Sequence, residues 1–164
     1  MQTVRNTQWE VSLIYLSLLF LVGCSDIPSE YKPFFRLPPD QQEKEIFNYS
    51  LDQQIDLVVL RMTVIRPPGT YLGTLIARNG EKLVPLLLSR LSTVENEPQL
   101  GAILYCLLEI DLRHYEWKND PKYMPLLQQE LAKMTDPALR QEATRALVSE
   151  AGSHADSRES SPEF

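Results

Sequence analysis

Residues 100–110 have the sequence LGAILYCLLEI, and this stretch decides the fold class. Its large aliphatic side chains recur at the spacing i, i+3, i+4, i+7 and i+8: Leu100, Ile103, Leu104, Leu107 and Leu108. Side chains at this spacing share one face of an α-helix, which turns once in about 3.6 residues. The stretch therefore predicts a helix with one buried apolar face.

Helical patterns also precede this stretch. Ser50 and Gln53 match a capping box, in which the two residues satisfy each other's backbone N–H groups. The apolar residues that follow recur on one helical face: Leu51, Ile55, Val58, Val59 and Met62. Pro67-Pro68 ends this pattern, and residues 69–78 (GTYLGTLIAR) predict a further short helix that ends at Asn79-Gly80.

Two more helix starts are predicted downstream. Asp120-Pro121 and Asp136-Pro137 each place a capping acid before a proline, which is typical of the first turn of a helix. The last helix has a predicted inner face of Leu139, Ala143, Ala146 and Leu147. No segment alternates apolar and polar residues over a length that indicates a strand. The chain is therefore predicted to be all-α.

Two stretches resemble each other at an offset near 40 residues. Val84-Pro85-Leu86-Leu87 aligns with Met124-Pro125-Leu126-Leu127 at an offset of 40, and Pro98 aligns with Pro137 at an offset of 39. Each unit is a helix with proline near its start, a polar turn and a second amphipathic helix. This period and layout resemble a HEAT repeat, a helical hairpin that stacks into a solenoid. An irregular helical bundle is the alternative.

The resemblance covers residues 81–149 and implies a short α-solenoid, with residues 40–79 as a divergent hairpin that covers one end. A proline inside a helix removes a hydrogen bond and clashes with the preceding turn. Because Pro85 and Pro125 occupy the same place in both units, they predict a shared kink.

The amino-terminal residues predict where in the cell the protein is located. Val11–Val22 (VSLIYLSLLFLV) is about a dozen apolar residues, whereas a helix needs roughly 20 to cross a bilayer. Its length favours the core of a signal peptide over a retained short anchor, although Arg5 is the only basic side chain ahead of it. The run closes with Leu21-Val22-Gly23-Cys24, which resembles the bacterial lipobox. The resemblance implies cleavage before Cys24 and acylation of that residue.

The resemblance to bacterial lipoproteins also implies which membrane the protein is anchored in. Ser25 follows the cysteine in place of aspartate, which favours the outer membrane by the sorting rule of Gram-negative lipoproteins. Several acyl chains anchor a protein stably, at ~0.8 kcal/mol per buried methylene. The predicted location is the cell envelope, with the protein attached to the membrane through lipidated Cys24 and facing the periplasm.

Composition divides the chain into four zones. They are a signal peptide (1–23), a Pro-rich tether (24–39), a helical repeat domain (40–149) and a disordered acidic tail (150–164). The tether holds four of the twelve prolines and is expected to be extended. Its Tyr31, Phe34 and Phe35 are expected either to pack back on the domain or to sit at the membrane surface.

Charge and residue content argue against several classes of function. The net charge of −6 gives nucleic acid binding no electrostatic support and favours a basic partner. The only histidines are His114 and His154, and lipidation consumes one of the two cysteines, so Cys106 has no partner for a disulfide or a zinc site. There is no Gly-rich phosphate loop and no nucleophile elbow. We therefore predict no catalytic residue, no metal and no cofactor.

One constellation is a candidate for binding. Arg113-His114-Tyr115-Glu116-Trp117 places aromatic and basic residues in an inter-repeat connection. Tyr, Trp and Arg are enriched in binding hot spots. The alternative is that Tyr115 and Trp117 pack in the joint between repeats. Arg113 is also expected to pair with Glu109 at the i, i+4 spacing.

These observations favour a lipid-anchored helical-repeat protein that binds another envelope protein and has no catalytic activity. The alternative is an immunity or inhibitor protein that blocks a toxic or hydrolytic enzyme in the periplasm. An enzyme acting on the cell wall would need a cluster of carboxylates or histidines that the sequence does not present.

Overall fold

A computed structural model describes residues 27–113 and 115–148, and these residues contain helices and no strand. The α-helices are α2 (Lys32–Phe35), α3 (Pro39–Glu45), α4 (Leu51–Thr63), α5 (Tyr71–Ile76), α6 (Val84–Leu91), α7 (Glu97–Arg113), α8 (Tyr123–Lys133) and α9 (Pro137–Val148). The 3₁₀-helices are η1 (Ile46–Asn48), η2 (Ala77–Lys82) and η3 (Trp117–Asn119). The all-α prediction is confirmed. The predicted signal peptide, Cys24, His114 and the predicted tail lie outside the described residues.

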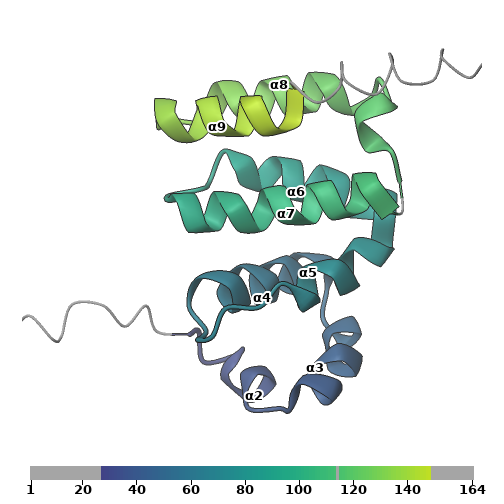
Figure 1. Ribbon diagram of the computed structural model, residues 1–164, viewed down its shortest axis with the longest axis vertical. Helices are drawn as coiled ribbons and strands as arrows, with labels where there is room; N and C mark the ends of the chain where they lie inside the picture. The colour runs from purple at the N-terminus through teal and green to yellow at the C-terminus, as the bar shows by residue number, and fades with distance from the viewer. Residues whose placement is uncertain (1–26, 114, 149–164) are drawn as a thin grey trace, which may run out of the picture.

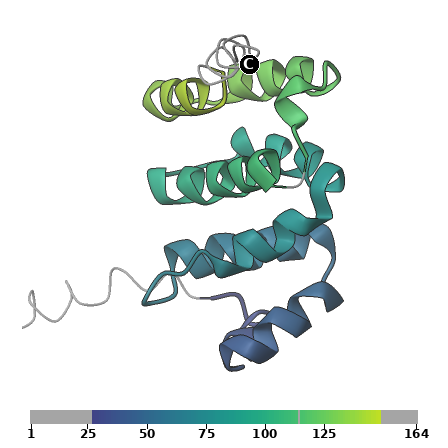
Figure 2. The ribbon, with the colours of Figure 1, turned by 45° about the vertical axis from the view of Figure 1, so that its right-hand side comes forward.

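Consecutive helices pair, and the pairs are stacked on one another (Figure 1). The pairs are α4 with α5, α6 with α7 and α8 with α9. Contacts between α4 and α7, between α6 and α8, and between α7 and α9 join neighbouring pairs. Figure 2 shows the same layers after a turn of 45°, with α2 and α3 on the outer side of the α4–α5 pair.

Helix α7 lies at the centre of this stack, in contact with α4, α5, α6 and α9. The predicted inner face is buried at Leu100, Ile103, Leu104 and Leu107, whereas Leu108 is only half-buried. Four further side chains are buried outside the predicted stripe: Ala102, Cys106, Glu109 and Ile110. The buried surface is wider than the stripe because helices pack against α7 from more than one side.

Helix α4 begins at the predicted capping box. The Gln53 backbone N–H donates to Ser50 Oγ at 3.3 Å, and the Ser50 N–H donates to Gln53 Oε1 at 3.1 Å. Ile55 and Val58 are buried as predicted. The other predicted positions, Leu51, Val59 and Met62, are only half-buried. Leu57 and Gln54 are buried as well, because α4 packs against α5, α6 and α7.

The two predicted helix starts at aspartates have different outcomes. Asp136 Oδ1 accepts from the backbone N–H groups of Ala138 and Leu139, at 2.8 and 3.2 Å, and α9 begins at Pro137 as predicted. Asp120 Oδ1 accepts from the Lys122 N–H at 3.1 Å. This bond closes a turn, so α8 begins only at Tyr123, and the start predicted at Pro121 is wrong.

The prediction of a shared proline kink does not hold. Pro85 is the second residue of α6, and Pro125 is the third residue of α8. The first backbone N–H groups of a helix have no intrahelical acceptor, so a proline there costs no hydrogen bond. Both prolines lie in the first turn, where a proline gives no physical reason for a kink.

The glycine in the connection between α5 and α6 has a conformational role. The predicted helix over residues 69–78 is observed as α5, and it is followed directly by η2. Within η2, Gly80 has φ of +54° and ψ of −126°, a backbone conformation that other residues rarely adopt. The chain turns at Gly80 and passes to the next helical pair.

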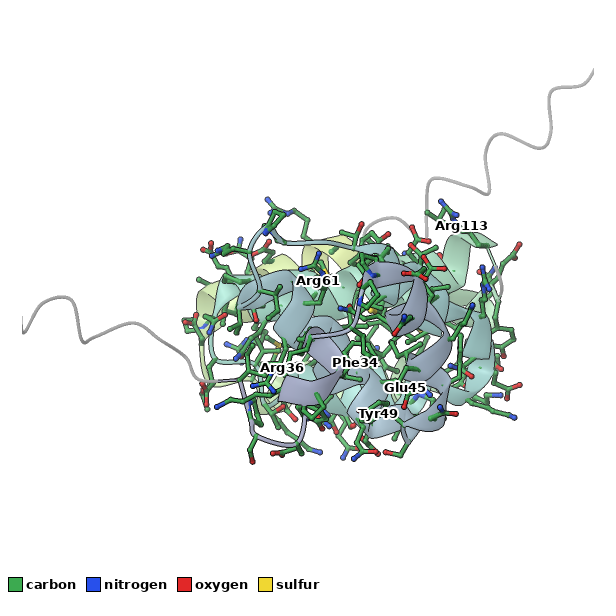
Figure 3. The ribbon with its side chains drawn as sticks, turned by 90° about the horizontal axis from the view of Figure 1, so that it is seen from below. Phe34, Arg36, Glu45, Tyr49, Arg61 and Arg113 are labelled. Carbon is green, nitrogen blue, oxygen red and sulfur yellow. The ribbon has the colours of Figure 1, made fainter. Side chains whose placement is uncertain are left out.

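The segment predicted as an extended tether is folded against the domain from Ile27 onward. Tyr31 and Phe34 are buried, and Ile27 and Phe35 pack against the core. The ring centroids of Phe34 and Tyr49 lie 5.7 Å apart, edge to face. Figure 3, which views the molecule from the end formed by α2 and α3, shows these two residues close together. The aromatic side chains thus outweigh the extended preference of the prolines by burying apolar surface.

None of the described helices combines the length and the apolar character that crossing a membrane requires. The apolar run at residues 11–22 is outside the described part of the chain.

Candidate interaction surfaces

The aromatic connection after α7 places its tryptophan in the core. Trp117 is fully buried, and its Nε1–H donates to the Leu107 carbonyl at 3.0 Å. The 3₁₀-helix η3 contacts both α7 and α8. Trp117 thus joins the two helical pairs, and this burial fits the packing alternative for its role.

Tyr115 belongs to a polar cluster next to Trp117. Its hydroxyl donates to Asp120 Oδ2 at 2.6 Å, and its ring lies edge to face with Tyr123, with centroids 6.4 Å apart. Lys122 Nζ lies 3.0 Å from Asp120 Oδ2, contacts the carboxylate of Glu81 and lies 4.7 Å from the Tyr123 ring centroid. The hydrogen bonds to Glu81 and Asp120 raise the pKa of Lys122. The hydrogen bond from Tyr115 and those from Lys122 lower the pKa of Asp120.

The exposed part of this connection lies at the end of α7. Arg113 Nε lies 3.1 Å from Glu109 Oε2, so the predicted i, i+4 pair is present. The Arg113 side chain is 59% exposed, and Leu112 is 73% exposed. His114 lies outside the described residues. The sequence prediction grouped Arg113, His114, Tyr115 and Trp117 as one binding surface. Of its described members, Arg113 is exposed, Tyr115 is half-buried and Trp117 is buried, and the neighbouring Leu112 and Glu116 are exposed as well.

A second surface is a cleft of about 390 Å³, which we call the amino-terminal cleft. Two of its walls come from residues 28–31 before α2 and from residues 55–60 of α4. The others come from residues 90–95, which include the end of α6 and the connection that follows it, and from the first turns of α7. Figure 1 shows the first described residues, before α2, at the same edge of the molecule as the α6–α7 connection. The cleft therefore includes residues close to the start of the described chain, beginning with Pro28.

The floor of the amino-terminal cleft is apolar. Ile55 and Ile103 are buried beneath it, and Val59, Leu60 and Val94 are half-buried at its surface. Water in contact with such a floor is released when an apolar group covers it. The floor can therefore hold an aliphatic or aromatic side chain.

A hydrogen-bonded charge network forms one wall of the amino-terminal cleft. The Tyr31 hydroxyl donates to Asp56 Oδ2 at 3.0 Å, and Arg90 Nη1 lies 3.1 Å from Asp56 Oδ1. Arg90 Nη2 also lies 3.3 Å from Asp52 Oδ1. Burial, followed by the hydrogen bond to Asp56, raises the pKa of Tyr31 to about 12. These contacts fix the segment before α2 to α4 and α6.

Sequence reasoning did not find the amino-terminal cleft. Its residues are separated by up to 75 positions, from Pro28 to Ile103, and no local motif connects them. The one available signal was the cluster of aromatic residues within the proline-rich segment, because it indicated that this segment packs on the domain.

The other described side chains that could take part in a reaction or bind a metal ion are not arranged to do so. Burial, with a smaller contribution from Glu109, raises the pKa of the Cys106 thiol to about 12. Its reactive thiolate form is therefore disfavoured at neutral pH. Among the residues that the structure describes, no group of three or more His, Cys, Asp or Glu side chains is placed to hold a metal ion. Comparison with protein-family models, curated proteins and solved structures found no match to this chain.

Proposed function

We propose that the chain is a lipid-anchored protein of the bacterial cell envelope that binds another envelope protein and performs no chemistry of its own. In this proposal Cys24 carries the acyl chains and Ser25 directs the protein to the outer membrane. The helices form a short HEAT-like solenoid that faces the periplasm.

The equivalence of two helical pairs supports the solenoid. Leu87 and Leu127, which align at an offset of 40, are both fully buried. Contacts join α6 to α8 and α7 to α9, as expected when equivalent helices of successive repeats stack. Asn96 Oδ1 accepts from the Gln99 N–H at 3.1 Å, and so caps α7 as Asp136, 40 residues later, caps α9. These matches support a repeated unit in preference to an irregular bundle.

The observation that carries the binding proposal is the amino-terminal cleft. It combines an apolar floor with charged walls, the combination found where proteins bind side chains of a partner. Its position also matters, because Pro28 in its wall follows Cys24 by only four residues. Four residues span at most about 14 Å when fully extended. A lipidated Cys24 therefore keeps this cleft near the membrane.

Site-specific cross-linking of the lipidated protein in cells tests the proposal. A photoreactive amino acid replaces Thr93, an exposed residue of the cleft wall, and in a control it replaces Gln141, an exposed residue of α9. We expect a defined adduct with one envelope protein from position 93, and a weaker one or none from position 141. Adducts of equal yield from both positions would contradict a role for the cleft.

Two further measurements define the partner and the anchor. Mass spectrometry identifies the protein in the adduct, and a toxic or hydrolytic enzyme there would favour the inhibitor hypothesis over a scaffolding role. In a Cys24→Ser background the adduct should be lost, because the uncut, unlipidated precursor is not sorted to the outer membrane. An adduct that is unchanged by Cys24→Ser would contradict the proposed role of the anchor.

A further inference from the structure

We infer that the amino-terminal cleft binds a basic segment of the partner protein, in which lysine or arginine residues flank an aliphatic side chain. This inference rests on the proposed function and specifies the chemistry of the segment that is bound. It follows from three properties of the cleft, which are its charge, its floor and its position.

The charge of the cleft is predominantly negative. Its lining contains three carboxylates, Glu30, Asp56 and Glu95, and one guanidinium, that of Arg90. Arg90 is already shared between Asp52 and Asp56. Asp56 is satisfied by Arg90 and by the Tyr31 hydroxyl. The charge that remains for a partner is therefore that of Glu30 and Glu95.

Glu30 and Glu95 come from different walls. Glu30 belongs to the segment before α2, and Glu95 belongs to the connection between α6 and α7. Both are exposed, and within the described residues no ion pair involves either of them. An extended segment that enters the cleft can thus bring one cation to each wall. Cations are favoured there by charge complementarity, which also steers a basic partner to the site.

The floor determines what lies between the two cations. The half-buried side chains of Val59, Leu60 and Val94 offer an apolar surface at the centre of the cleft. The volume of about 390 Å³ lies near the lower end of the range for ligand pockets, which is roughly 300–1,000 Å³. This volume suits one or two side chains of a segment that continues beyond the cleft on both sides.

The position and charge of the cleft disfavour other occupants. Anionic lipid head groups are repelled by the carboxylates, although the cleft is close to the proposed anchor. The carboxyl-terminal segment of the chain, residues 149–164, carries an excess of acidic residues and is repelled in the same way. A basic segment of an envelope protein close to the membrane is the occupant that fits both the charge and the floor.

Peptide binding to the mature lipidated protein, in nonionic detergent, tests this inference by fluorescence anisotropy. The probes are three labelled peptides of equal length. The first alternates lysine with leucine and valine, the second replaces lysine with glutamate, and the third replaces leucine and valine with serine. We expect the first peptide to bind tightest and its affinity to fall as salt is raised, because exposed charges are screened. Equal binding of the lysine and glutamate peptides, or no binding of the first peptide, would overturn the inference.

Variants assign the binding to the cleft. Glu30→Gln with Glu95→Gln should weaken binding of the first peptide by about three- to ten-fold, the loss of two exposed charge pairs. The matched control is Glu43→Gln with Glu45→Gln on α3, which changes the net charge equally but lies outside the cleft lining. An equal loss in the control would show that net charge, and not the cleft, attracts the peptide.

Two more outcomes separate the possible explanations. Charge reversal by Glu95→Lys should weaken the lysine peptide and strengthen the glutamate peptide, a pattern that unfolding cannot produce. If a chain ending at Val148 binds the first peptide much more tightly, the carboxyl-terminal segment occupies the cleft and the inference is wrong. Cross-linking through position 93 without any peptide preference would refute this inference alone and leave the proposed function standing.

Discussion

Replacing Trp117 with alanine tests how the two helical pairs α6–α7 and α8–α9 are joined. The Trp117 side chain has no exposed surface, and its Nε1–H is bonded to the Leu107 carbonyl. Truncating a fully buried aromatic side chain costs about 3–5 kcal/mol, because it removes apolar contacts and leaves a cavity. We therefore expect Trp117→Ala to lower the free energy of unfolding by about that amount.

Two controls divide this cost into its parts. Trp117→Phe keeps most of the packing and removes the hydrogen bond, so about 1–2 kcal/mol of stability should be lost. Leu112→Ala changes a side chain that is 73% exposed in the same part of the chain. Its effect should stay within about 0.5 kcal/mol.

Urea unfolding followed by circular dichroism and tryptophan fluorescence measures these effects. In a soluble form that begins at Ser25, Trp117 is the only tryptophan, since the other one is Trp9. Its emission should be blue-shifted in the folded state and shift to the red on unfolding. A loss below about 1 kcal/mol for Trp117→Ala, or a folded-state emission like that of the unfolded chain, would refute the packing role of Trp117.

The remaining predictions concern the anchor, the core and the response to pH. Cys24→Ser should abolish lipidation and leave the precursor uncut, whereas Cys106→Ser should not, and intact-mass analysis of the membrane fraction distinguishes the two. Fractionation should recover the wild-type protein with the outer membrane, and recovery with the inner membrane would contradict the role of Ser25. Leu104→Ala should cost about 2–5 kcal/mol in urea unfolding, and a near-neutral effect would show that the inner face of α7 is assigned incorrectly. The raised pKa of Tyr31 favours its protonated form in the folded state, so its contribution to stability is complete below about pH 10 and is lost as the pH rises toward about 12. Tyr31→Phe should flatten the decline of stability over this pH range, and an unchanged slope would contradict that contribution.

Helix positions were predictable where the signal is local. The capping boxes and caps at Ser50 and Asp136 depend on groups within three residues of each other, so the sequence alone locates the starts of α4 and α9. The stripe from Leu100 to Leu107 likewise follows from the period of the helix. At Asp120 the same local signal misled, because its side chain closes a turn and its other oxygen is held by Tyr115 and Lys122.

The number of helix faces that are buried in the core was decided by the packing of the helices. The period of α7 predicts one buried face, but Cys106 and Ile110 are also buried because α7 is surrounded by other helices. In α4, the buried Gln54 is accommodated because its amide donates to the Tyr49 carbonyl and its oxygen accepts from Asn79. A helical period contains no information about how many neighbours a helix has.

The candidate surfaces were also only partly predictable from the sequence. The residue types of the aromatic connection were evident from the chain, but only the three-dimensional packing shows that Trp117 is buried while Leu112 and Arg113 remain exposed. The amino-terminal cleft exists because Tyr31 binds Asp56, which brings the segment before α2 beside the α6–α7 connection. Caps and amphipathic stripes arise between residues within one or two helical turns, so the sequence reveals them. A cleft arises between segments that meet only on folding, so it depends on the tertiary structure.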